Sequence, residues 1–173
     1  KGESFVYIEG FGKKIIRHIL TAKFISDGYQ LSIGNNMYEP MTDFSSTMVI
    51  TRAALETYLT FHFLFVDPID DDKKRFRFLC WHISGFLDRA EHEPEFDVQK
   101  ELKKNETALL VAYQEELKTN PYFLTITPEA QKRALKGEWK IFDGWSKLAV
   151  NAGFQEAFFR QQYRFLCSYS HSG

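Results

Sequence analysis

Apolar residues recur every three or four positions along much of the chain, and this is the spacing of an amphipathic α-helix. Proline, glycine and helix-capping residues separate one such segment from the next. The pattern predicts helices over residues 4–31, 43–66, 70–91, 96–118, 128–136 and 154–169, with a short element at 145–150. We therefore expect five or six helices, the first of which ends near Gly34.

The apolar run Tyr122–Ile126 is the best candidate for a strand, but a buried linker between two helices explains it more simply. The chain has 17 Phe but only 5 Pro and 10 Gly, too few turn residues for a sandwich of many strands. With 173 residues it has the length of one domain. The predicted fold is an all-α, single helical bundle over residues 1–173. Because the chain opens at Lys1 without Met and stops at Gly173, we expect that the natural protein can extend at either end.

The segment 43–66 is apolar almost all round, which is typical of the central helix of a bundle. Asp43 or Ser45 can cap its start. Arg52, Glu56 and Thr60 form a polar line along it, one helical turn apart. Buried charge must be paired, so we expect Arg52 to bind Glu56.

The charges nearly balance: 22 Lys and Arg stand against 23 Asp and Glu, a formal net charge of −1. No overall field therefore draws the chain to nucleic acid or anionic lipid, and any contact with RNA must be local. The longest apolar run, Tyr58–Val66, is about half of a membrane span. These features predict a cytoplasmic globular protein with no membrane contact.

Most enzyme signatures are missing from the sequence, including the phosphate loop, the dinucleotide-binding glycine pattern, the nucleophile elbow and the zinc-binding helix. Cys80 and Cys167 lie far apart within apolar runs and are expected to be small buried hydrophobic residues. We therefore expect neither a metal nor a cofactor.

The five histidines are scattered, and His171 alone falls where an exposed turn is expected, after the last helix. Arg164 lies seven residues earlier, near the end of that helix. A histidine that moves protons beside a fixed cation is what metal-free RNA cleavage needs, because the arginine can stabilise charge developing on the phosphate. The alternative is that Arg164 pairs with an acid and His171 lies on a frayed end.

Three segments resemble an uncharacterised bacterial family of all-helical proteins, a domain of unknown function. They are Ile50–Tyr58, Arg75–Trp81 and the ending Gly153–His171. Arg52 and Glu56 match an Arg-x3-Glu helix of that family. Tyr163, Leu166 and His171 match its ending, with Cys167 in the place of a serine.

The architecture of that family is in turn similar to the HEPN superfamily of helical bundles, which includes toxin and phage-defence ribonucleases. Their motif is an arginine and a histidine separated by four to six residues, and Arg164 and His171 fit with six between them. This resemblance implies a homodimer with the site across its twofold axis. We expect Phe165, directly after the arginine, to face packing and not solvent.

Two functions stay open. The first is a metal-independent endoribonuclease with His171 as general acid and base, Arg164 on the phosphate, and Arg52 and Glu56 orienting them. The second is an inert module that docks a protein partner or a nucleotide in a polar pocket lined by Arg52, Glu56, Tyr163 and His171. A plainer alternative is that Arg52 and Glu56 only satisfy each other inside the bundle.

Overall fold

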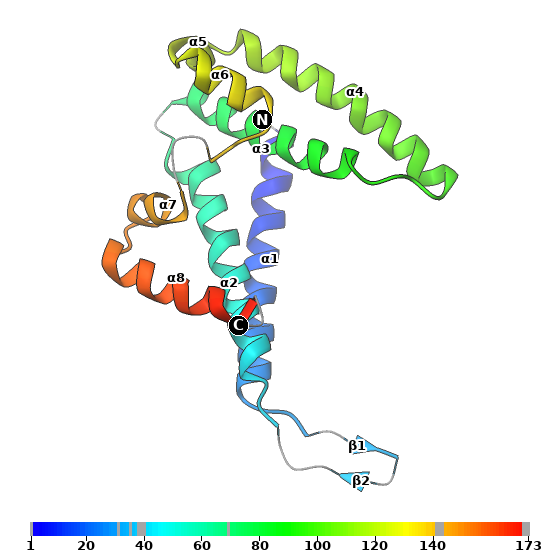
Figure 1. The fold of residues 1–173 in the computed structure, drawn as a ribbon, viewed down its shortest axis with the longest axis vertical. Coiled ribbons are helices and arrows are strands. Elements are labelled where there is room, and N and C mark those ends of the chain that lie inside the picture. Colours follow the sequence, from blue (N-terminus) through cyan, green and yellow to red (C-terminus); the bar gives the residue numbers. More distant parts are fainter. Residues whose placement is uncertain are drawn as a thin grey trace. The chain divides into compact units, whose positions relative to one another are not determined.

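The computed structural model of the chain describes residues 2–30, 32–34, 36–37, 41–68, 70–140 and 144–170. Within these residues the chain is mostly helical (Figure 1). Its elements are α1 (Gly2–Ser26), β1 (Ser32–Ile33), β2 (Asn36–Met37), α2 (Phe44–Phe61), the π-helical segment η1 (His62–Val66), α3 (Asp71–Ala90), α4 (Asp97–Thr119), α5 (Pro121–Thr125), α6 (Pro128–Leu135), α7 (Trp145–Asn151) and α8 (Glu156–Ser170). The predicted all-α class is confirmed, but the described residues form eight α-helices where five or six were expected.

The contacts between backbone positions divide the chain into two compact units. Unit 1 comprises Lys1–Phe65 and Trp145–Gly173, and unit 2 comprises Val66–Gly144. In unit 1, α2 packs against α1, α7 and α8. In unit 2, α3 packs against α4, α5 and α6. Each unit is therefore organised around one helix.

The central helix of unit 1 is α2, as its apolar sequence predicts. It begins after Asp43, whose side chain accepts a hydrogen bond from the Ser46 backbone N–H at 2.9 Å and so caps the first turn. Leu59 on α2 and Leu64 on η1 are fully buried. On the α1 side, the ring centroid of Phe11 lies 6.2 Å from that of Phe61. These contacts confirm the expected central position of the segment 43–66.

One helical stretch among the described residues, Phe44–Val66, is long and apolar enough to cross a membrane by length and composition. The sequence pattern predicted no segment long enough to span a membrane, because only the uninterrupted apolar run Tyr58–Val66 was considered. That prediction is corrected, since the whole helical stretch has the required length and mean hydropathy. Core helices of soluble proteins pass the same test. This stretch also packs against three other helices and carries Arg52 and Glu56 near its middle, so it is weak evidence for a membrane span.

Unit 2 has a core of buried residues contributed by α3, α4, α5 and α6. The N-cap of α3 is Asp70, whose carboxylate accepts from the Lys73 backbone N–H at 2.7 Å. Burial raises the pKa of the Cys80 thiol to about 12, so the predicted buried role of this cysteine is confirmed. The other cysteine, Cys167 of unit 1, is only partly buried.

The segment expected to be a linker, Tyr122–Ile126, is mostly the short helix α5. Asn120 explains the difference, because its side-chain oxygen accepts from the Phe123 backbone N–H at 3.1 Å and so starts a helical turn. Pro121 then occupies the first turn, where its missing N–H costs nothing.

The first helix is shorter than predicted and a small hairpin follows it. α1 ends at Ser26, because Gly28 adopts a left-handed conformation with φ of +85°. Further on, β1 pairs with β2 in antiparallel register. The expectation of no strand is therefore corrected at this hairpin.

Candidate functional site

The predicted pair of Arg52 and Glu56 is present on α2. The Nε of Arg52 donates to Oε1 of Glu56 at 2.8 Å. The two side chains are 23% and 27% exposed, so the pair is partly shielded from water. The hydrogen bond to Glu56 raises the pKa of Arg52. The expectation that these opposite charges satisfy each other is confirmed.

Tyr163 brings α8 to this pair. Its hydroxyl donates to the same Oε1 of Glu56 at 2.5 Å, and the guanidinium carbon of Arg52 lies 5.5 Å from the centre of its ring. Burial raises the pKa of Tyr163 above its usual value, and the hydrogen bond to the Glu56 carboxylate raises it further. The Glu56 carboxylate thus binds the guanidinium of Arg52 on its own helix and the phenol of Tyr163 on α8. We call Arg52, Glu56 and Tyr163 the α2–α8 cluster.

Aromatic rings support Tyr163 within unit 1. The Phe159 ring, one helical turn earlier on α8, stacks on it at 5.3 Å with an interplanar angle of 14°. The Trp145 ring of α7 lies 6.3 Å away. Neither Phe159 nor Trp145 was among the site residues expected from the sequence, although the spacing of four between Phe159 and Tyr163 indicates that they share a helix face.

The third member of the predicted polar line, Thr60, does not join the cluster. Its hydroxyl donates to the Glu56 backbone carbonyl at 2.8 Å. Thr57 makes the same kind of bond to the carbonyl of Ala53, at 2.7 Å. Short hydroxyl side chains in an apolar helix commonly satisfy themselves in this way, so Thr60 contributes no group to a ligand.

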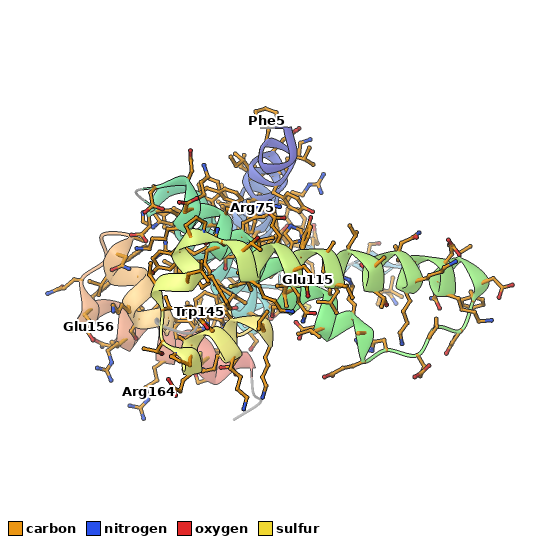
Figure 2. All side chains as sticks on the ribbon, turned by 90° about the horizontal axis from the view of Figure 1, so that it is seen from above. Phe5, Arg75, Glu115, Trp145, Glu156 and Arg164 are labelled. Carbon is orange, nitrogen blue, oxygen red and sulfur yellow. The ribbon has the colours of Figure 1, made fainter. Side chains whose placement is uncertain are left out.

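Arg164 follows Tyr163 in sequence but points elsewhere. Consecutive residues of an α-helix lie about 100° apart around its axis, so Tyr163 faces α2 while Arg164 is exposed. Figure 2 shows the Arg164 side chain extending outward. Within the part of the chain that the structure describes, no hydrogen bond or ion pair engages its guanidinium. The structure therefore does not bring Arg164 to Arg52 and Glu56, which were expected to orient it.

The exposed side of α8 carries an open cleft of about 560 Å³. Its lining comprises Arg160, Gln161, Arg164, Phe165 and Ser168. We call this surface the α8 outer face. Arg160 reaches Glu156 only at 3.6 Å, so both arginines can meet an anion from solution. The expectation that Phe165 faces packing is wrong: its side chain is 46% exposed, and its ring contacts only the edge of Tyr169, at 5.2 Å, among the described residues.

The candidate histidine, His171, lies outside the described residues, directly after the last residue of α8. Its proximity to Arg164 stays a prediction. Among the residues that are described, no three His, Cys, Asp or Glu side chains form a group that could hold a metal ion.

The described residues thus form a helical protein with a cluster of paired polar groups between α2 and α8 and exposed arginines on the α8 outer face. The chain belongs to DUF5677, a family of unknown function whose model matches residues 30–173. The match includes α2 and α8 and leaves α1 outside it. No curated protein and no solved structure matches the chain.

Removing the Tyr163 hydroxyl should destabilise unit 1. Tyr163→Phe deletes one hydrogen bond to a partly buried carboxylate, and bonds to charged groups contribute about 1.5–3 kcal/mol. We expect a loss of this size in the free energy of unfolding, measured by urea denaturation. Tyr169→Phe is the matched control, because the Tyr169 hydroxyl makes no hydrogen bond among the described residues and its loss should change stability little.

The same bond predicts a dependence on alkaline pH. The pKa of Tyr163 is raised in the folded protein, so its contribution is complete below the ordinary tyrosine pKa of about 10. It is lost as the pH rises toward the raised value, because the unfolded state releases the proton first. Above about pH 10, the stability difference between the wild type and Tyr163→Phe should shrink. A difference that is constant with pH would contradict this origin.

Proposed function

We propose that the chain is a HEPN-like, metal-independent endoribonuclease that contacts RNA through the α8 outer face. The observation that carries this proposal is Arg164, whose guanidinium is exposed and engaged by no other described side chain. A cation kept free at the surface is available to a phosphate, whereas one bound to a carboxylate is not. Its neighbours Arg160, Gln161 and Ser168 add hydrogen-bond donors for the same strand.

In the proposed reaction, the 2′-oxygen of a ribose attacks the adjacent phosphorus and the bond from phosphorus to the 5′-oxygen breaks. His171 takes the proton of the 2′-hydroxyl as general base and then gives it to the leaving 5′-oxygen as general acid. The products are a 2′,3′-cyclic phosphate and a 5′-hydroxyl. Arg164 stabilises the negative charge that develops on the non-bridging oxygens. The step needs no redox partner, and its protons balance.

The α2–α8 cluster acts in this proposal as an anchor and not as a part of the reacting site. Arg52 and Glu56 bind Tyr163, which precedes Arg164 by one residue. Fixing the inner side of α8 therefore fixes the direction of its outer side. Glu56 is a positioning residue in this scheme. The proposed setting is a cytoplasmic toxin or phage-defence system.

The experiment is an RNA cleavage assay in the presence of a chelator, comparing the wild type with His171→Ala. General acid–base catalysis contributes about 10²–10⁴-fold, so the variant should lose at least that much activity while keeping its helical circular-dichroism spectrum. Full activity in a folded His171→Ala protein would refute the assignment. A wild type that cleaves none of a diverse set of RNAs would refute the ribonuclease itself.

A second candidate function is binding without catalysis at the same face. It is favoured by Phe165, which lines the same cleft as the arginines and is 46% exposed. Its ring contacts that of Tyr169, which also meets the exposed ring of Phe44 on α2. Such rings bind unpaired bases or apolar protein side chains. The nucleotide pocket that the sequence suggested around Arg52, Glu56 and Tyr163 has less support, because their polar atoms already bind one another.

A further inference from the structure

The solvent side of α8 carries cations and aromatic rings in two separate rows. Arg160 and Arg164 are four residues apart and form the arginine row. Phe158 and Phe165 are seven residues apart and form the phenylalanine row, in which the Phe158 side chain is 56% exposed. Residues with these spacings lie within about 40° of one another around a helix, and Gln161 falls between the two rows. One edge of this surface therefore offers guanidinium groups and the other offers aromatic faces.

The Phe165 ring is supported from within unit 1. It lies 5.2 Å from the Tyr169 ring, at an interplanar angle of 71°. The Tyr169 ring in turn lies 5.4 Å from that of Phe44 on α2. These contacts hold the Phe165 ring in place before a ligand arrives, which lowers the entropy cost of binding. Nearly half of the side chain stays exposed, so a flat ligand can stack on it.

Phosphate contacts alone give this surface little affinity for a nucleic acid. The chain has a formal net charge of −1, and Arg160 lies 3.6 Å from the carboxylate of Glu156. The electrostatic part of binding grows with the number of phosphates neutralised and is weakened by salt, and two arginines neutralise few. Stacking of one base on an aromatic side chain changes affinity by roughly 5- to 150-fold. The rings therefore decide which strands bind, and a duplex hides the base faces that an unpaired strand presents.

We propose that the two rows select an unpaired RNA strand, with its bases stacked on Phe158 and Phe165 and its phosphates along the arginine row. This inference rests on the proposed function, because it takes the α8 outer face as the surface that contacts RNA, and it adds the class of strand. Stacking uses a face that every base has, so recognition tolerates different sequences. Phe158 and Phe165 are specificity-determining residues in this scheme, and no proton of the cleavage step passes through them.

The test measures binding of an RNA that the proposed reaction cannot cleave. Methylation of every 2′-oxygen prevents its attack on phosphorus, so affinity is measured without turnover. A labelled single strand of mixed sequence and its blunt duplex are each titrated with the full chain and followed by fluorescence anisotropy. The single strand should bind about tenfold more tightly or better. Phe158→Ala and Phe165→Ala should each weaken single-strand binding by roughly 5- to 150-fold and leave duplex binding unchanged, whereas Arg160→Ala should weaken both.

Two further variants identify the kind of contact. Phe165→Leu keeps an apolar side chain but loses the aromatic face, so it should weaken RNA binding almost as much as Phe165→Ala, whereas an apolar protein partner would tolerate it. Phe24→Ala is the matched control, because it removes a ring that is 66% exposed on α1, and it should bind as the wild type does. Circular dichroism confirms that each variant is folded.

The outcomes separate this inference from the ribonuclease. A duplex that binds as tightly as the single strand would overturn the inference, as would wild-type affinity in Phe158→Ala and Phe165→Ala or in Phe165→Leu. Each of these results leaves the ribonuclease standing, since the cleavage assay with His171→Ala decides it. A wild type that binds the single strand as expected but cleaves no RNA would refute the ribonuclease alone.

Discussion

Replacing Arg164 by alanine is expected to slow metal-free RNA cleavage by about 10²–10³-fold, the usual cost of removing one group that stabilises transition-state charge. The fold should be unaffected, because Arg164 makes no hydrogen bond or ion pair with any described residue. The loss should fall on kcat more than on KM, since the charge that Arg164 binds develops only as the phosphorus is attacked. Single-turnover cleavage of a labelled RNA with a chelator present measures it.

Arg160→Ala is the matched control for Arg164→Ala. Arg160 lines the same cleft one helical turn earlier, but it has a carboxylate, Glu156, at 3.6 Å. Removing a residue that only contacts phosphate should weaken RNA binding and reduce the dependence of the binding constant on salt by about one charge. It should have little effect on the cleavage rate at saturating RNA. Arg164→Lys should recover part of the rate, because lysine keeps the charge but not the two-pronged geometry. Equal losses in kcat for Arg160→Ala and Arg164→Ala would contradict a catalytic role for Arg164.

The helices of this chain follow from its local sequence signals wherever capping and periodicity agree. The starts of α2 and α3 fall one residue after Asp43 and Asp70, which are both N-caps in the structure, and α6 starts after Thr127 as the Thr-Pro pair predicts. The short helix α5 was missed because a segment of five residues is too short to show a helical period. Its start signal, Asn120 before Pro121, was nevertheless present.

The candidate site could be predicted only in part. The pair of Arg52 and Glu56 follows from one rule, that opposite charges four residues apart on an apolar helix bind each other. The contact of Tyr163 with Glu56 joins residues 107 positions apart, and no periodicity in the sequence specifies such a contact. Only the resemblance placed Tyr163 beside them. The sequence could have predicted that Arg164 points outward. Tyr163 and Leu166 lie on the inner side of α8, and Arg164 is about 100° around the helix from Tyr163.

Gly137→Ala is expected to destabilise unit 2 by about 2–5 kcal/mol, combining a left-handed backbone with overpacking. Gly137 follows the end of α6 and has a φ of +73°, a conformation that costs a residue with a Cβ roughly 1–2 kcal/mol. An added Cβ would also lie 2.6 Å from the Cα and 2.7 Å from the backbone nitrogen of Ser84 on α3. Backbone atoms in a helix cannot move aside as a flexible side chain can, so α6 and α3 must separate.

Gly153→Ala is the matched control that separates backbone strain from the steric clash of a residue-137 Cβ with Ser84. Gly153 also has a left-handed backbone, with φ of +90°, but a Cβ there meets nothing within 4 Å. It should therefore cost only the roughly 1–2 kcal/mol of backbone strain. Hydrogen exchange followed by mass spectrometry separates the two, because Gly137→Ala should speed exchange in α3 and α6 while Gly153→Ala acts on α7 and α8. Equal losses at both positions would mean that the α3 backbone does not restrict residue 137, and that the close packing of α6 on α3 is not what requires glycine there.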